Sequence, residues 1–143
     1  MEYRRLGRSG LQVSALSFGA WVTFGSQMDE AAAEESMQAA REAGVNFFDN
    51  AEAYEAGESE RIMGKAMAAL GLPRDTFAVS SKVFWGGDEP MRLGLSAKPM
   101  QLGLSAKHVR DACEAALARL DVDYLDLFFC HRPDIDTPIE ETV

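Results

Sequence analysis

Apolar residues recur at helical spacing in several stretches of this chain, and shorter apolar runs separate those stretches. The clearest helical pattern follows Ser105 and ends near Asp121. Its apolar positions fall at i, i+3, i+4, i+7, i+8 and i+11: Val109, Ala112, Cys113, Ala116, Leu117 and Leu120. This spacing predicts an amphipathic helix with one buried face, and Ser105 is suited to cap its start.

Two further stretches have the same periodicity. Residues 29–44 begin with Asp29 as a candidate N-cap, carry Arg41 in the last turn and end at Gly44. Residues 57–71 place a second set of apolar side chains on one face: Ile62, Met63, Ala66, Met67 and Leu70. Both stretches therefore predict helices that cover a core.

Compact apolar runs at residues 15–19, 45–51, 77–82 and 124–131 predict strands between these helices. An additional hairpin, turning at "GRSG", is expected before the first of them. Strands that alternate with helices favour an α/β fold with a parallel sheet. An open dinucleotide-binding sheet would need G-x-G-x-x-G after a strand, and that motif is absent from the sequence. We therefore expect residues 1–143 to form the N-terminal half of a (β/α)8 TIM barrel, preceded by the short β-hairpin.

The last residues, "TPIEETV", carry the pattern of a helix start. Thr137 is a candidate N-cap, Pro138 suits the first helical position, and Glu140 completes a capping box. Only Val143 follows the two glutamates. We expect the chain to be truncated at the start of a fourth major helix.

A short repeat lies before the third helix. "PMRLGLSAK" at 90–98 is followed directly by "PMQLGLSAK" at 99–107. One repetition of nine residues is too short for a solenoid. The pattern indicates a tandem duplication in a loop, where an insertion costs little stability.

Composition narrows the class of protein. Hydrophobic content of 47% and charged content of 26% are typical of a globular domain. The net charge of −9 argues against nucleic acid and against insertion at an anionic membrane, and no run approaches the ~20 apolar residues of a membrane span. The histidines and cysteines form no metal-binding spacing, so no metal is expected. Cys113 and Cys130 are expected to be buried thiols, and the protein to be cytoplasmic.

Polar residues at the ends of the predicted strands suggest a reaction site. Asp49, Lys82 and His131 end three of the strands, and Tyr54 follows Asp49 by five residues. Each has an ordinary alternative: a turn-forming aspartate, a loop tyrosine, a solvated lysine and a packed histidine. Together they favour a site, because a lysine ending a buried strand needs a counter-charge, which Asp49 could supply.

Such a set could protonate a carbonyl oxygen. A free tyrosine, with a pKa near ~10, is a poor acid at neutral pH, and a neighbouring lysine cation favours the phenolate. Asp49 would hold Lys82, and His131 would orient the substrate oxygen. Reduction of an aldehyde or ketone would then require a hydride from a nicotinamide cofactor.

Five segments resemble the aldo-keto reductases, and within them the branch related to the β-subunits of voltage-gated potassium channels. They are "GAWVTFG", "VNFFDNAEAY", "SSKVFWGG", "GLSAKHV" and "DYLDLFFCHRPDIDTPIEETV". The resemblance implies a barrel closed at its base by the hairpin, and NADPH-dependent reduction of a small carbonyl substrate. It implies a catalytic set with Tyr54 as general acid: Asp49, Tyr54, Lys82 and His131. It also implies cofactor contacts: Ala20, Trp21, Gln27, Asp49 and the position of His131.

The resemblance leaves other functions open. One alternative is an NADPH-sensing regulatory subunit, tetrameric by resemblance, that serves a potassium channel. The animal channel subunits look to have asparagine at the position of His131, so His131 favours a working reductase. Family members are about twice this length, and the absent half would carry most of the cofactor-binding residues. A catalytically silent fragment is therefore a further alternative, and the carbonyl substrate stays open.

Overall fold

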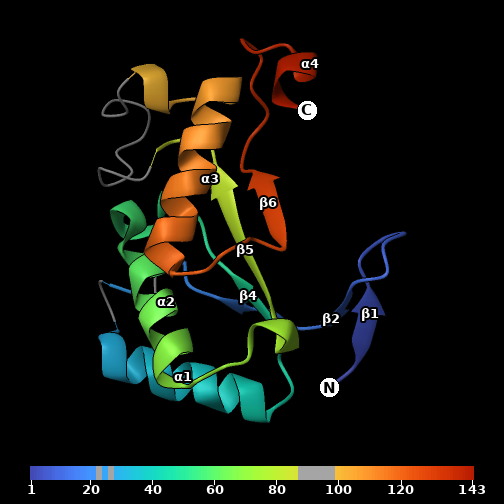
Figure 1. Ribbon diagram of the computed structural model, residues 1–143, viewed down its shortest axis with the longest axis vertical. Helices are drawn as coiled ribbons and strands as arrows, with labels where there is room; N and C mark the ends of the chain where they lie inside the picture. The colour runs from blue at the N-terminus through green and yellow to red at the C-terminus, as the bar shows by residue number, and fades with distance from the viewer. Residues whose placement is uncertain (22–23, 26–27, 87–98) are drawn as a thin grey trace.

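The computed structural model of the chain describes residues 1–21, 24–25, 28–86 and 99–143 (Figure 1). A two-stranded antiparallel hairpin comes first, formed by β1 (Tyr3–Arg5) and β2 (Gln12–Ser14). A four-stranded parallel sheet follows in the order β3-β4-β5-β6. Its strands are β3 (Phe18–Gly19), β4 (Phe47–Asp49), β5 (Ala78–Val83) and β6 (Leu127–Cys130). The predicted α/β class, parallel sheet and hairpin are confirmed.

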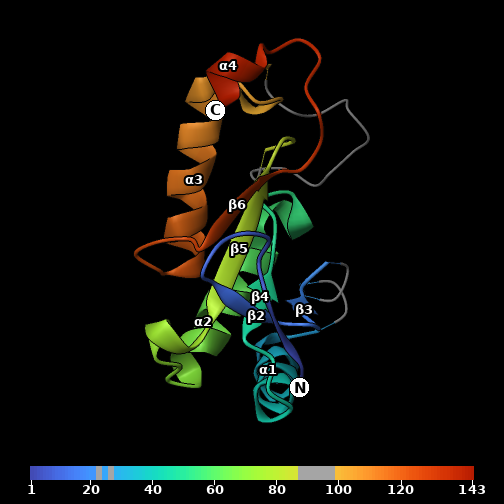
Figure 2. The same ribbon diagram turned by 90° about the vertical axis from the view of Figure 1, so that its right-hand side faces the viewer.

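Three long helices connect these strands. They are α1 (Glu30–Glu42), α2 (Glu58–Ala69) and α3 (Ala106–Leu120). The helices stand next to one another along the sheet (Figures 1 and 2). Short 3-10 turns lie at Tyr54–Gly57, Arg74–Thr76 and Pro99–Gln101. Strand neighbours in sequence are also neighbours in the sheet, so their carboxyl ends meet at one edge.

The core lies between the sheet and the helices. Phe48 of β4 and Val79 of β5 are fully buried there against Met37 of α1 and Met63 of α2. Since side chains alternate along a strand, the residues next to these core positions point to the other face. Asp49 and Lys82 are on that opposite face, away from the helices. The alternation thus separates the packing side chains from the predicted site residues Asp49 and Lys82.

The predicted helix starts are confirmed for α1 and α3. Asp29 caps α1 by accepting a hydrogen bond from the backbone N–H of Ala32 at 2.9 Å. Ser105 caps α3 by accepting from the N–H of His108 at 3.2 Å. Where α2 meets the end of α3, a Cβ on Gly64 would lie 2.5 Å from the carbonyl oxygen of Leu120. Only glycine permits this close approach.

The hairpin is attached to the end of the sheet where β4 begins. The N–H of Ser14 donates to the side-chain oxygen of Asn46 at 2.7 Å, and the N–H of Asn46 donates to the Ser14 hydroxyl at 3.1 Å. Asn46 directly precedes β4. These reciprocal bonds hold the hairpin at the end of the sheet opposite Asp49 and Lys82.

The predicted capping box at the C-terminal end is wrong. The final helical turn, α4, spans Ile139–Thr142, and its N-cap is Pro138, which makes no side-chain cap. The Thr137 hydroxyl donates instead to the Asp134 carboxylate at 2.7 Å. That carboxylate also accepts from the N–H of Leu104 at 2.8 Å, so it is already fixed beside Thr137. A carboxylate three residues earlier has thus taken the hydroxyl that the pattern assigned to the cap.

The expected burial of the cysteines is wrong for Cys130. Cys130 is exposed on β6, which contradicts the expected burial, because β6 is the last strand of the described sheet. Cys113 is half-buried.

The first copy of the nine-residue repeat, 90–98, lies outside the described residues. The second copy, 99–107, forms the Pro99–Gln101 turn and continues into α3.

Among the helices in the described ranges, none could span a lipid bilayer.

Candidate active site

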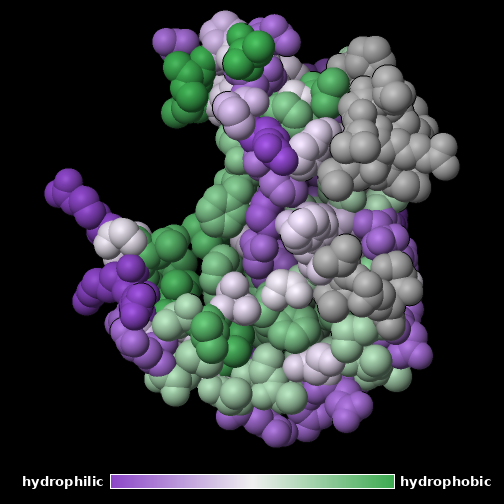
Figure 3. Space-filling view, turned by 180° about the vertical axis from the view of Figure 1, so that it is seen from behind, coloured by the Kyte–Doolittle hydropathy of each residue, from purple (hydrophilic) through white to green (hydrophobic). Residues whose placement is uncertain are grey.

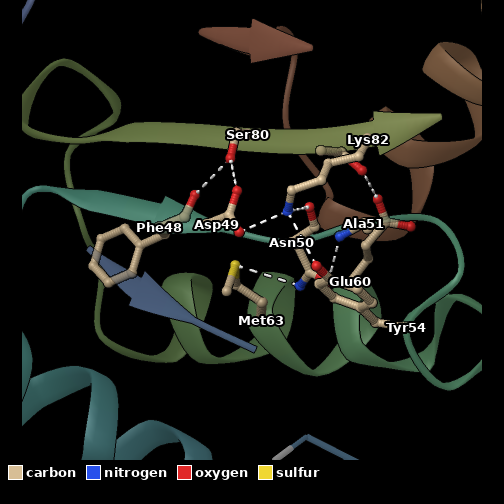
Figure 4. A network of polar contacts seen from close by, with 10 residues as sticks. Phe48, Asp49, Asn50, Ala51, Tyr54, Glu60, Met63, Ser80 and Lys82 are labelled. Atoms are coloured by element: carbon tan, nitrogen blue, oxygen red, sulfur yellow. Dashed lines mark hydrogen bonds and ion pairs between the residues drawn. The ribbon is translucent and has the colours of Figure 1, made fainter. Parts of the chain in front are cut away.

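The predicted site residues converge at the carboxyl ends of β4, β5 and β6. The Lys82 ammonium is at the centre of the group, and three oxygen atoms surround it (Figure 4). Lys82 Nζ lies 2.6 Å from Asp49 Oδ2, 2.8 Å from the Asn50 carbonyl oxygen and 3.3 Å from the Tyr54 hydroxyl. An ammonium has three N–H donors, and this geometry provides an acceptor for each. The Lys82 side chain is only 15% exposed, so its charge interacts in a weakly screened environment.

A buried serine fixes the Asp49 carboxylate. Asp49 pairs with Ser80 in the parallel register, and Ser80 Oγ donates to Asp49 Oδ1 at 2.7 Å. One carboxylate oxygen therefore binds Ser80 while the other binds Lys82. Sequence reasoning missed Ser80, because a serine inside a strand carries no signal of its own. The register between β4 and β5 is what brings it to Asp49.

The turn between Asp49 and Tyr54 is held from within. The fully buried Asn50 side chain accepts from the N–H of Ala51 at 2.9 Å and reaches Met63 Sδ of α2 at 3.6 Å. Beyond Tyr54, Glu55 and Ala56 have φ values of 47° and 54°. Residues with a Cβ rarely adopt positive φ, and such backbone strain concentrates at functional sites.

The Tyr54 hydroxyl faces the Lys82 ammonium. Its oxygen accepts from Lys82 Nζ, and the ammonium lies 5.0 Å from the ring centroid. Because the oxygen acts as the acceptor in that bond, its own O–H can donate elsewhere. The ring is stacked near Trp21 with centroids 6.3 Å apart, and it meets the His131 ring edge-on at 5.8 Å.

His131 follows β6 and completes the predicted group. Its backbone N–H donates to the Val83 carbonyl at 3.0 Å, which extends the pairing of β5 with β6. The imidazole packs edge-on against Trp85 with ring centroids 4.8 Å apart. Burial lowers the pKa of His131, and the nearby Lys82 cation lowers it further. Its buried Nδ1 has no hydrogen-bond partner among the described residues. The imidazole is therefore neutral near pH 7.

The residues that the resemblance implies as cofactor contacts differ in their exposure to solvent. Trp21 is 61% exposed beside Tyr54, so it offers a flat aromatic face. The Ala20 methyl is fully buried, its N–H donates to the Asp49 carbonyl, and its carbonyl accepts from Phe24. Ala20 thus extends the pairing of β3 with β4, and its contact with a cofactor stays a prediction. Gln27 lies outside the described residues.

In the part of the chain that the structure describes, no group of three or more His, Cys, Asp or Glu side chains is placed to hold a metal ion.

Comparison with known proteins gives a consistent family. The Aldo/keto reductase family model matches residues 15–143. A protein of Oryza sativa subsp. japonica named "Probable voltage-gated potassium channel subunit beta" is 54% identical over 143 residues, and a protein of the same name from Arabidopsis thaliana is 52% identical. Each alignment covers 100% of this chain and 41% of the relative, so the chain spans less than half the length of these relatives. The chain belongs to the aldo/keto reductase family.

Proposed function

We propose that these residues carry the proton-transfer apparatus of an NADPH-dependent reductase that converts an aldehyde or ketone to an alcohol. The observation that carries the proposal is the contact of Lys82 Nζ with the Tyr54 hydroxyl, while Asp49 and Asn50 hold the ammonium from two other directions. The fold supports the proposal. A parallel sheet with the reactive residues at the carboxyl ends of its strands fits the N-terminal half of a (β/α)8 barrel.

In the proposed reaction, Tyr54 donates its O–H proton to the carbonyl oxygen of the substrate. The phenolate that remains is stabilised by the Lys82 ammonium, which is already in position and needs no reorganisation. Asp49 keeps that ammonium in position. Neutral His131, packed against Tyr54, orients the substrate oxygen without competing for the proton.

The residues around Tyr54 fit a nicotinamide cofactor. An exposed aromatic face at Trp21 flanks the Tyr54 ring, as does a buried nitrogen of His131 that has no hydrogen-bond partner within the described ranges. These surroundings suit a flat, polar ring system. When bound, NADPH supplies the hydride that reduces the carbonyl carbon. Within this chain, Trp21, His131 and Asp49 would line that ring, with Ala20 and Gln27 as further predicted contacts.

The test is consumption of NADPH by the product of the complete reading frame. Absorbance at the nicotinamide band is followed with an aromatic aldehyde, and Tyr54→Phe is compared with the parent. We expect kcat to fall about 10²- to 10⁴-fold, because the substitution removes the general acid and leaves the ring in place. Tyr124→Phe is the matched control, since Tyr124 lies beside Arg74, away from the site, and should leave kcat unchanged. No oxidation of NADPH, or equal rates in parent and Tyr54→Phe, would reject the reductase.

The names of the relatives support a second candidate. Both plant relatives are named as potassium channel β subunits, so this chain could belong to a cytoplasmic, tetrameric regulator that senses NADPH for a channel. The discriminating experiment is a pull-down with the cytoplasmic domain of a potassium channel, with and without NADPH. Binding that responds to NADPH, together with absent turnover, would favour the regulator.

We further propose that the isolated 143-residue chain is weakly active or inactive and self-associates. Among the described strands, β3 and β6 have one unpaired edge each, and unpaired edges recruit other strands. Hydrophobic residues, green in Figure 3, also gather on the side of the molecule turned away in Figure 1. Light scattering tests this, and a monodisperse monomer that oxidises NADPH would contradict it.

A further inference from the structure

Glu52 is a buried carboxylate inside the turn that joins Asp49 to Tyr54. It is 2% exposed, and its side-chain contacts are to groups other than Lys82. Glu52 Oε1 accepts two backbone hydrogen bonds, from Phe84 N at 2.7 Å and from Gly86 N at 2.9 Å. These donors lie on either side of Trp85, just beyond β5. A single carboxylate oxygen therefore holds the backbone that carries Trp85.

The second carboxylate oxygen of Glu52 faces His108 of α3. Glu52 Oε2 lies 3.5 Å from His108 Nε2, and His108 Nδ1 lies 2.8 Å from the Gly103 carbonyl oxygen. A carbonyl can only accept, so Nδ1 carries a proton, and Nε2 faces a carboxylate that also only accepts. Burial alone would lower the pKa of His108, but the hydrogen bonds to Glu52 and Gly103 outweigh it and raise that pKa. Both ring nitrogens of His108 thus face acceptors, an arrangement that favours the protonated ring.

Further hydrogen bonds join the chain segments around Glu52 to one another. The N–H of Gly103 donates to the Phe84 carbonyl at 2.8 Å, so the segment before α3 is bound to the segment after β5. The N–H of Glu52 donates to the Lys82 carbonyl at 3.2 Å, which binds the turn after β4 to the same place. Glu52 bonds Lys82 of β5 through its backbone, the residues after β5 through Oε1, and faces α3 through Oε2.

Trp85 transmits this arrangement to the candidate active site. Its ring packs against His131 with centroids 4.8 Å apart, and the Arg132 guanidinium lies over it at 5.3 Å. Burial is the largest cause of the lowered pKa of His131, and Trp85 is the nearest ring covering it. The backbone on both sides of Trp85 depends on Glu52 Oε1. A displacement of Glu52 would therefore uncover His131.

We propose that Glu52 is a positioning residue, which, with His108, sets Trp85 against His131 and keeps the Tyr54 turn in register with Lys82. This inference rests on the proposed reductase, because it assigns Glu52 a role in that site. Glu60 offers a matched comparison. It is equally buried, binds Arg119 at 2.5 Å and Ser81 at 2.6 Å, and joins α2 to α3 and β5 without contacting Trp85.

Two conservative substitutions separate the reach of the Glu52 side chain from its charge. Glu52→Gln keeps an oxygen for Phe84 and Gly86, and its amide N–H can donate to a neutral His108 Nε2, so every hydrogen bond survives. Glu52→Asp keeps the charge but is one methylene shorter, so it withdraws from the two N–H groups. If the length of the Glu52 side chain is what positions Trp85, the protein keeps its activity in Glu52→Gln and loses activity in Glu52→Asp.

The experiment uses the product of the complete reading frame and measures two quantities. The first is kcat, and the second is the midpoint of the His131 titration, which NMR of labelled histidine reports without substrate. For Glu52→Asp we expect kcat to fall about 10- to 100-fold, as misplaced catalytic geometry does, and the His131 midpoint to rise toward about 6.5. For Glu52→Gln we expect kcat close to that of the parent. Its His131 midpoint should stay or fall slightly, because the negative charge of Glu52 raises the pKa of His131. Glu60→Asp should leave the midpoint unchanged.

The reverse pattern, with Gln impaired and Asp tolerated, would overturn positioning by reach and leave a purely electrostatic role. Equal behaviour of Glu52→Asp and Glu60→Asp would also overturn it, since the effect would then be one of stability alone. If the parent oxidises no NADPH, the reductase proposal fails by itself. The His131 midpoint would still decide whether Glu52 places Trp85, because that measurement needs no substrate.

Discussion

Two pairs of similar chemistry occupy opposite ends of the parallel sheet. Lys82 Nζ lies 2.6 Å from Asp49 Oδ2 at the carboxyl ends of the strands, and an Arg74 guanidinium nitrogen lies 2.6 Å from Asp126 Oδ2 where β5 and β6 begin. The side chains are similarly shielded, at 15% and 26% exposed for the first pair and 24% and 15% for the second. Distance and burial alone do not distinguish a candidate site from a structural support.

The neighbours of each pair make the difference. The Arg74 guanidinium lies 3.7 Å over the Tyr124 ring and donates to the carbonyls of Phe77 and Tyr124, while Asp126 also accepts from the N–H of Val79. These partners are backbone groups and a ring face, and none has a proton to transfer. Lys82 instead has one of its donors on the Tyr54 hydroxyl. The Lys82–Asp49 pair therefore differs from the Arg74–Asp126 pair in contacting a hydroxyl group that can lose its proton.

The largest expected effect is that of Lys82→Met on activity. We expect kcat for carbonyl reduction to fall about 10²- to 10⁴-fold, because the phenolate of Tyr54 loses the cation that stabilises it. Steady-state kinetics with NADPH check this, and urea unfolding verifies that the variant is folded. Activity close to that of the parent would remove the distinction between the two pairs.

Arg74→Met is the matched change at the other end of the sheet. We expect the free energy of unfolding to fall by about 2–4 kcal/mol, because Asp126 keeps its burial and loses its charged partner. The kcat of the folded fraction should not change. Urea titration and kinetics on the same sample measure both. A loss of kcat without a loss of stability would show that this pair also serves the reaction.

Ser80→Ala should have an intermediate effect. It removes the bond that fixes Asp49 Oδ1 and should cost about 1–2 kcal/mol in the reaction, a factor of about 5–30 in kcat. Ser81→Ala is the control, because the Ser81 hydroxyl donates to Glu60 on the helix side. Stability should fall in that control without a change in kcat. Similar kcat losses in both variants would contradict a role for Ser80 in holding Asp49.

The smallest effect expected is a pair of opposite pH dependences. The pKa of His131 is lowered, so its contribution to stability is lost as pH falls below about 6.5 toward its folded value. The pKa of His108 is raised, so its contribution is complete below about 6.5 and is lost as pH rises through its folded value. NMR titration of both rings measures the two midpoints. Midpoints on the same side of about 6.5 would contradict the difference in environment.

The sequence by itself determined the element order and the polar residues at the strand ends. Helical spacing, the caps Asp29 and Ser105, and compact apolar runs are local signals, and the structure contains the elements that they predict. Because parallel strands share one carboxyl edge, the sequence also indicated that Asp49, Lys82 and His131 would lie near one another. In the structure Asp49 contacts Lys82 and His131 packs against Tyr54, whereas the catalytic roles of these residues stay proposals.

The tertiary structure alone decided which neighbours each polar group binds. Ser80 reaches Asp49 through strand register, Glu52 reaches the backbone on either side of Trp85, and Asp134 reaches the N–H of Leu104. These bonds join residues whose separation in sequence carries no periodic signal. A buried carboxylate binds the donors that the packed chain brings within reach, and only the folded structure reveals which donors those are.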